Sequence, residues 1–219
     1  MTAFCRDDTD VISFYINFSE LASWLTLKPL MKLIEETGVE VEMLPVLGSL
    51  GNVVTRRQTG EDDPLEAYKA RRARARQQSS AREFERICER LDLEERQASR
   101  HIDPLSASLG LIWLKEVDRE FDEMRYAEAV FEAAFRKGVA IGERDDIEQL
   151  IDGLGLPSKG FKAFADIRMA GLVANSEASL EAGILSAPAF VLHGEVFHGR
   201  EHLPLLAWLV KGSVGPPPV

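Results

Sequence analysis

The chain has 219 residues, of which 45% are hydrophobic and 28% are charged, the composition of a globular protein that can bury a sizeable core. Its formal net charge of −10 argues against nucleic acid as the main partner, because binding to phosphates needs an excess of Lys and Arg. The N-terminus does not lead from basic residues into an apolar stretch, and no window reaches about 18 apolar residues. We therefore expect a cytoplasmic protein that binds no membrane.

The chain begins with a predicted strand, helix and strand. Residues 11–18 are apolar, β-branched and aromatic, which is typical of a strand covered on both faces. Ser19 is a suitable N-cap for a helix from about Glu20 to Thr37. Residues 39–44 alternate between apolar and acidic side chains, the pattern of a half-exposed strand. A crossover of this kind makes the two strands parallel.

An irregular segment at 45–60 is followed by a mainly helical stretch that extends to about Gly183. The spacing of apolar residues predicts helices from Pro64 to Leu91, after Pro104, from Phe121 to Phe135, over 147–153, and from a Ser158 cap to Leu180.

A basic run lies early in this helical stretch. Alanines separate most of its members, Lys69, Arg71, Arg72, Arg74 and Arg76. The pattern predicts an exposed helix face that is solvated or paired within the molecule, and a site for a polyanion is the alternative.

The C-terminal residues predict two short strands and a closing helix. Pro188 cannot donate to a sheet ladder, so it must open a strand at 189–192. Gly194 then turns the chain into a strand at 195–198, and Leu203–Val210 form the last helix. A small residue before a proline suits a cis peptide bond, although an ordinary hairpin opened by a trans proline fits the spacing equally well.

These C-terminal residues resemble a known family. The sequence Ala187-Pro188-Ala189-Phe190-Val191, with 197–203 after it, resembles the end of the DsbA-like superfamily, in particular the branch of the kappa-class glutathione transferases and the 2-hydroxychromene-2-carboxylate isomerases. The resemblance implies an α/β thioredoxin-like fold (βαβ…ββα) with a large all-helical domain inserted between its halves. It also implies that Pro188 is cis and that the backbone of Ala187 faces the active site.

The resemblance divides the chain into four parts. Residues 1–60 would form the first half of the thioredoxin-like domain and 61–182 the inserted helical domain. Residues 183–212 would form the second half, and 213–219 a C-terminal tail.

A first group of site residues lies where the first strand meets the first helix. Ser23 and Trp24 match a serine and an aromatic residue of the family motif, but the serine that bonds the glutathione sulfur in the family falls on Glu20. A carboxylate there would repel a glutathione thiolate. Ser19 could replace the missing donor. Two interpretations stay open: Ser19 and Glu20 are a helix cap and a first-turn acid, or Glu20 is the general base of an isomerisation.

A second group follows Gly199. The family holds the γ-glutamyl end of glutathione at these positions, so Glu201 would pair with the ammonium and Arg200 with the carboxylate, with His202 beside them. First-turn surface charge is the alternative. We expect no metal, because neither a cysteine nor an HExxH pattern accompanies the histidines.

The resemblance implies a glutathione-dependent transferase or isomerase that acts on a small electrophilic, aromatic or unsaturated substrate. Glutathione would be a co-substrate, and the protein would be a homodimer. Ser19 or Glu20 would be catalytic, and binding would involve Ser23, Trp24, Ala187, Pro188, Arg200, Glu201 and His202. Thiol–disulfide exchange is disfavoured because the two cysteines, Cys5 and Cys88, form no CxxC. The alternative is a family member by fold only, a non-catalytic protein that binds a small molecule or a peptide.

Overall fold

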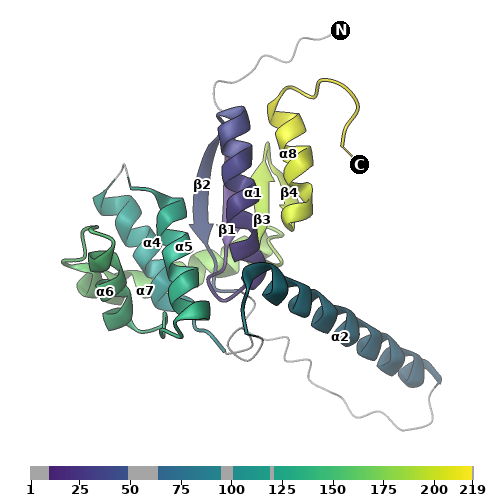
Figure 1. Ribbon diagram of the computed structural model, residues 1–219, viewed down its shortest axis with the longest axis horizontal. Helices are drawn as coiled ribbons and strands as arrows, with labels where there is room; N and C mark the ends of the chain where they lie inside the picture. The colour runs from purple at the N-terminus through teal and green to yellow at the C-terminus, as the bar shows by residue number, and fades with distance from the viewer. Residues whose placement is uncertain (1–9, 49–63, 95–100, 119–120, 219) are drawn as a thin grey trace. The chain divides into compact units, whose positions relative to one another are not determined.

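Four strands form a mixed sheet in the order β2-β1-β3-β4 (Figure 1). A computed structural model describes residues 10–48, 64–94, 101–118 and 121–218, and mainly the backbone between 64 and 81. The strands are β1 (Val11–Ile16), β2 (Glu40–Pro45), β3 (Ala189–Leu192) and β4 (Glu195–His198). β1 pairs in parallel with β2 and antiparallel with β3, which pairs antiparallel with β4. The predicted βαβ and ββα halves are confirmed.

One face of β1 is completely buried. Its alternate residues Ile12, Phe14 and Ile16 have no exposed surface, and Phe14 stacks on Phe190 of β3 with ring centroids 5.1 Å apart. The strand ends at Ile16, two residues before the predicted end, because the chain turns at Asn17, whose carbonyl accepts a bond from Glu20 N–H at 3.1 Å.

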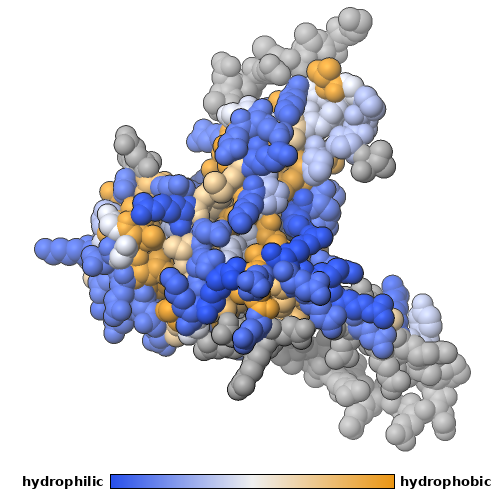
Figure 2. All heavy atoms as spheres, in the orientation of Figure 1, coloured by the Kyte–Doolittle hydropathy of each residue, from blue (hydrophilic) through white to orange (hydrophobic). Residues whose placement is uncertain are grey.

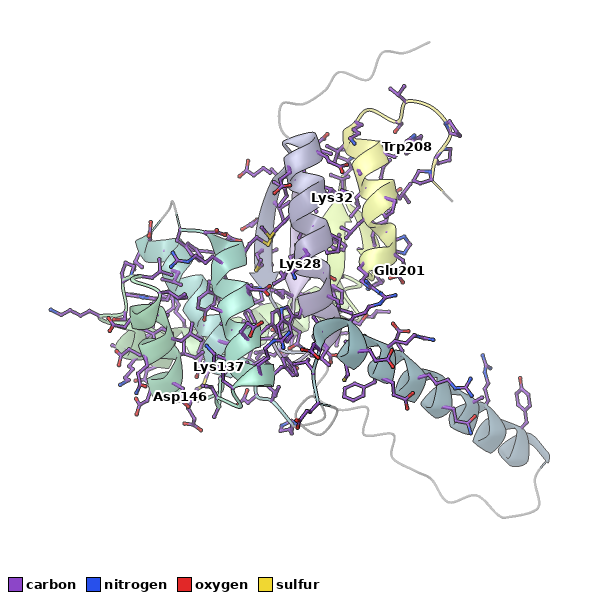
Figure 3. The ribbon with its side chains drawn as sticks, viewed as in Figure 1. Lys28, Lys32, Lys137, Asp146, Glu201 and Trp208 are labelled. Carbon is purple, nitrogen blue, oxygen red and sulfur yellow. The ribbon has the colours of Figure 1, made fainter. Side chains whose placement is uncertain are left out.

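Two helices that start at the same edge of the sheet contact each other. They are α1 (Leu21–Thr37) and α8 (Leu203–Val210). The α1 helix ends at Gly38, which adopts a left-handed conformation with φ of 67°. Its outward side carries Lys28 and Lys32 (Figure 3), and hydrophilic residues dominate this side of the surface (Figure 2).

The remaining helices fall into two units. Segments 1–49 and 101–219 form one unit, which contains the sheet and the helices α4 (Leu105–Val117), α5 (Glu123–Phe131), α6 (Arg144–Gly153) and α7 (Phe161–Glu181). Helix α2 (Pro64–Leu91) lies in the second unit, 50–100. The boundaries of these two units differ from those of the predicted helical domain at 61–182. That domain stays a prediction based on the resemblance.

Two local predictions are wrong. Ser158 does not cap α7, because Gly160 is the residue before the first helical turn, with φ of 103°, and the Ser158 hydroxyl donates to Asp152 instead. The predicted single helix over 121–135 is α5 followed by a π-helical turn, η1 (Glu132–Arg136). Among the described residues, no helix is both long enough and apolar enough to cross a bilayer.

Candidate functional site

The register of the sheet brings three chain segments to one edge. Tyr15 lies opposite Ala189, and Ala189 lies opposite His198, so the end of β1, the start of β3 and the end of β4 share this edge. Gly199 N–H donates to the Pro188 carbonyl at 2.8 Å, which extends the β3–β4 pairing beyond the strands. Segments 17–20 and 199–202 therefore leave the sheet at the edge where 187–188 enters it, with β3 between β1 and β4.

The Ala187–Pro188 peptide bond is cis, as the resemblance implied. Pro188 is buried and Ala187 is half-buried. The predicted ligand contact of the Ala187 backbone stays a prediction.

Asn17 organises the turn between β1 and α1, and the sequence analysis did not identify it. Its side chain is 3% exposed, and its Oδ1 accepts bonds from Ser19 N–H at 2.9 Å and from the Ser19 hydroxyl at 2.8 Å. Its own N–H donates to the Ser23 hydroxyl oxygen at 3.3 Å. An asparagine two residues before a serine at a strand end is a signal for such an Asx turn.

Ser19 is not the N-cap of α1, which corrects the sequence prediction. Glu20 holds that position: its carbonyl accepts from Ser23 N–H at 2.9 Å and from Trp24 N–H at 3.4 Å. Asn17 already receives the Ser19 hydroxyl hydrogen. Ser19 could donate to a ligand only by giving up that bond.

Glu20 stands at the N-terminus of α1 on the same edge. The residue is exposed as a whole, and its side chain caps no backbone N–H. Partial burial of the carboxyl nevertheless raises the pKa of Glu20 above its ordinary value of 4.5. A carboxyl with a raised pKa holds a proton more readily near neutral pH, which suits an acid–base role.

Ser23 and Trp24 lie behind this turn. Ser23 is completely buried, so it supports Asn17 and presents no surface to a ligand. Trp24 is 3% exposed and stacks on Phe131 of α5, with centroids 5.8 Å apart, and on Phe135 of η1 at 6.0 Å. Both residues position the site in this structure.

Arg200, Glu201 and His202 form the short 3₁₀ helix η2 (Arg200–His202), directly after Gly199. Figure 3 shows Glu201 at the start of α8. The Glu201 carboxylate lies over Gly199 so closely that a Cβ on this glycine would overlap it. The His202 ring packs against Phe197, with centroids 5.9 Å apart. The half-exposed Arg200 and the exposed Glu201 are thus consecutive residues directly after β4 and Gly199.

The whole architecture is similar to that of known structures. The 2-hydroxychromene-2-carboxylate isomerase matches with a TM-score of 0.59 and 16% identity, over 94% of each chain. A probable DsbA oxidoreductase from Streptomyces coelicolor matches with a TM-score of 0.64 and 13% identity, over 96% of this chain and 93% of that chain. The chain has the DsbA-like thioredoxin fold.

A further structure with the DsbA-like thioredoxin fold was solved with GSH. It is the cytosolic disulfide reductase DsbM from Pseudomonas aeruginosa, with a TM-score of 0.58 and 15% identity, over 93% of this chain and 98% of that chain. No protein-family model and no curated protein sequence matches the chain. At 13–16% sequence identity, these similarities show a shared fold and nothing further.

The edge residues of this fold suit a zwitterionic thiol peptide. Arg200 and Glu201 carry opposite charges, as the carboxylate and ammonium of a γ-glutamyl group do. A carboxylate at Glu20 would repel a thiolate, but a protonated Glu20 would not. An ionised Glu20 could therefore face a neutral thiol, and a protonated Glu20 could face a thiolate.

Proposed function

We propose that the protein is a glutathione-dependent isomerase or transferase that acts on a small electrophilic substrate, with Glu20 as its acid–base group. The observation that carries the proposal is the position of Glu20, a carboxyl with a raised pKa at the N-terminus of α1, on the edge of the sheet that also holds cis-Pro188, Arg200 and Glu201. The similarity in fold to an isomerase supports the reaction class.

Glutathione would supply a thiol nucleophile that adds to an electrophilic carbon. Glu20 would take the thiol proton and return it to the substrate, so its pKa must be close enough to neutral for both steps. Arg200 and Glu201 would hold the far end of the peptide by two charge-assisted hydrogen bonds. Asn17 would keep the turn and Glu20 in place through its bonds with Ser19 and Ser23.

Thiol–disulfide exchange fits these residues poorly. Residues 10–25, which include the end of β1 and the start of α1, contain no cysteine. Dithiol exchange needs an attacking thiolate at that position.

Calorimetric titration with reduced glutathione tests the proposal. We expect a dissociation constant between about 1 μM and 1 mM for the unmodified protein, and loss of measurable heat in an Arg200→Ala, Glu201→Ala double variant. The matched control is Lys32→Ala, Glu36→Ala, which removes one base and one acid from an exposed ion pair within α1. The control should bind as the unmodified protein does. Absence of heat for the unmodified protein at millimolar glutathione would contradict the proposal.

A non-catalytic binding protein is the second candidate, and the Ser19 hydroxyl favours it. That hydroxyl is bonded to Asn17, so no free hydroxyl donor stands beside Glu20 in this turn to activate a sulfur. Glutathione binding in the titration, with no turnover of unsaturated electrophiles by the unmodified protein, would select this candidate. Light scattering would check the expected homodimer in the same samples.

A further inference from the structure

Helix α2 concentrates positive charge in an acidic chain. Its 28 residues include eight Lys and Arg and four Glu, a net charge of +4. The rest of the chain holds 18 basic and 32 acidic residues, so its net charge is −14. The formal charge of −10 led us to expect no nucleic-acid partner, but it averages two regions of opposite sign.

The charge is further concentrated in one part of α2. Residues 69–76 contain Lys69 and four arginines, and no acidic residue. None of the four arginines has an acidic residue three or four positions away, where helical neighbours lie. Like charges occur at helical spacing instead, at the i,i+3 pairs 69/72 and 71/74 and the i,i+4 pair 72/76, and such pairs destabilise a helix.

The C-terminal half of the same helix is different. Arg82 and Arg86 each have a glutamate three or four positions away within the helix, Arg86 forms an ion pair with Glu83, and Arg90 has Glu94 four positions on, just beyond the end of the helix. Glutamates at helical spacing therefore accompany Arg82 and Arg86, and none accompanies the arginines of 69–76.

The helical repeat divides the cations of 69–76 between two opposite flanks. With 3.6 residues per turn, positions 71 and 74 lie on one flank, and positions 69, 72 and 76 lie on the other. Arg72 and Ala75 are exposed. A flat acidic protein surface could engage only one of these flanks at a time.

We propose that residues 69–76 of α2 bind in the major groove of duplex DNA, with the two cationic flanks against the two phosphate strands. The major groove is about 12 Å wide, and a helix with its side chains is about 10–12 Å across. The groove presents phosphates on both sides of an inserted helix, which matches the two flanks. The contacts are with phosphates, so the binding is independent of sequence. The proposal does not depend on glutathione.

Fluorescence anisotropy of the full chain with a labelled 20-base-pair DNA duplex of mixed sequence tests this. Five phosphate contacts predict that the logarithm of the association constant falls with the logarithm of salt concentration with a slope of about −4.5. The variant Arg71→Gln, Arg72→Gln, Arg74→Gln, Arg76→Gln should bind at least about 10-fold more weakly at 50 mM salt, with a slope near −1. Circular dichroism would confirm that the variant keeps its helix content.

The matched control is Arg82→Gln, Arg86→Gln, Arg90→Gln, which removes three positive charges from the same helix. It should retain affinity within about threefold, because these arginines have acidic neighbours. An equal loss in both variants, or no binding by the unmodified protein at 50 mM salt, would overturn the proposal.

Two further ligands test the groove itself. Polyglutamate presents anionic charge without a groove, and duplex RNA has a major groove that is too deep and narrow to read from outside. We expect both to bind at least about 10-fold more weakly than duplex DNA at equal charge. Equal affinity for either one would overturn the assignment to the DNA major groove.

Discussion

Gly110 of α4 and Tyr126 of α5 are in such close contact that a Cβ on Gly110 would overlap the Tyr126 hydroxyl. Tyr126 is completely buried, and its hydroxyl donates to the Ala107 carbonyl at 2.8 Å. The ring of Tyr126 also meets Phe18 edge-on, with centroids 6.1 Å apart. The absence of a side chain at Gly110 therefore lets α4 pack directly against Tyr126 of α5, whose ring contacts Phe18 in the turn before α1.

Gly110→Ala should destabilise the protein by about 1–3 kcal/mol, because the added methyl group overpacks this contact. Urea denaturation measures the change. Gly171→Ala is the matched control, since Gly171 lies within α7 and no described atom would come within 4 Å of the added Cβ. It should stabilise the protein by about 0.5–1 kcal/mol through helix propensity. Equal effects of the two substitutions would contradict the contact.

Ser19→Ala should cost about 0.5–1.5 kcal/mol of stability, because it removes the hydroxyl that donates to Asn17. Glutathione affinity in the calorimetric titration should change by less than about twofold, because that hydrogen is directed at Asn17 and not at a ligand. Unchanged stability combined with lost binding would show instead that the hydroxyl serves the ligand.

Glu20→Gln should make the protein more stable at pH 7 than the unmodified chain. The raised pKa of Glu20 means that the folded state binds the proton more tightly than the unfolded state does. The stability of the unmodified protein therefore falls as the pH rises from about 4.5 through the folded-state pKa. Denaturation curves at several pH values should converge below about pH 4 and separate above it. Curves with a constant offset would be inconsistent with a raised pKa.

Lys115→Met should destabilise the protein by about 1–3 kcal/mol, because Lys115 Nζ donates to the Met43 carbonyl at 2.9 Å and lies 3.5 Å from Glu123 Oε1. Burial raises the pKa of Glu123, and the charge of Lys115 opposes that rise. Without Lys115 the folded-state pKa of Glu123 rises further, so the destabilisation should be larger at pH 7 than at pH 4.

The control for Lys115→Met is Lys162→Met, which removes an exposed lysine that pairs with Asp145 and Glu148. It should change stability little, because exposed ion pairs are screened by solvent. A loss in Lys115→Met that does not depend on pH would contradict the coupling to Glu123.

The residues that begin and connect the two C-terminal strands made these strands predictable from sequence. β3 and β4 have the predicted bounds, because Pro188 can only begin a strand, and the pair His193 and Gly194, with φ of 52° and 79°, supplies the tight turn. The cis bond at Pro188 and the shared edge of the site followed from the resemblance.

The turn before α1 was not predictable from helix propensity alone. Ser19 and Glu20 both suit a helix start. In the structure Ser19 donates two hydrogen bonds to Asn17, and Glu20 is the N-cap. The partners of Trp24 are more than 100 residues away along the chain, in α5 and η1, so no local pattern revealed that Trp24 is a packing residue. The π-helical turn breaks the 3.6-residue period on which the prediction of that helix relied.

Side-chain hydrogen bonds at Met43 occupy backbone groups on one edge of the sheet. β2 is an edge strand, and its Met43 N–H donates to the Glu123 carboxylate at 2.9 Å while its carbonyl accepts from Lys115. An extended segment that joined β2 would have to displace both side chains, which blocks the most direct route to edge-to-edge aggregation there. If a peptide extends this sheet, it must do so beside β4, the other edge strand, which ends at the charged pair Arg200 and Glu201.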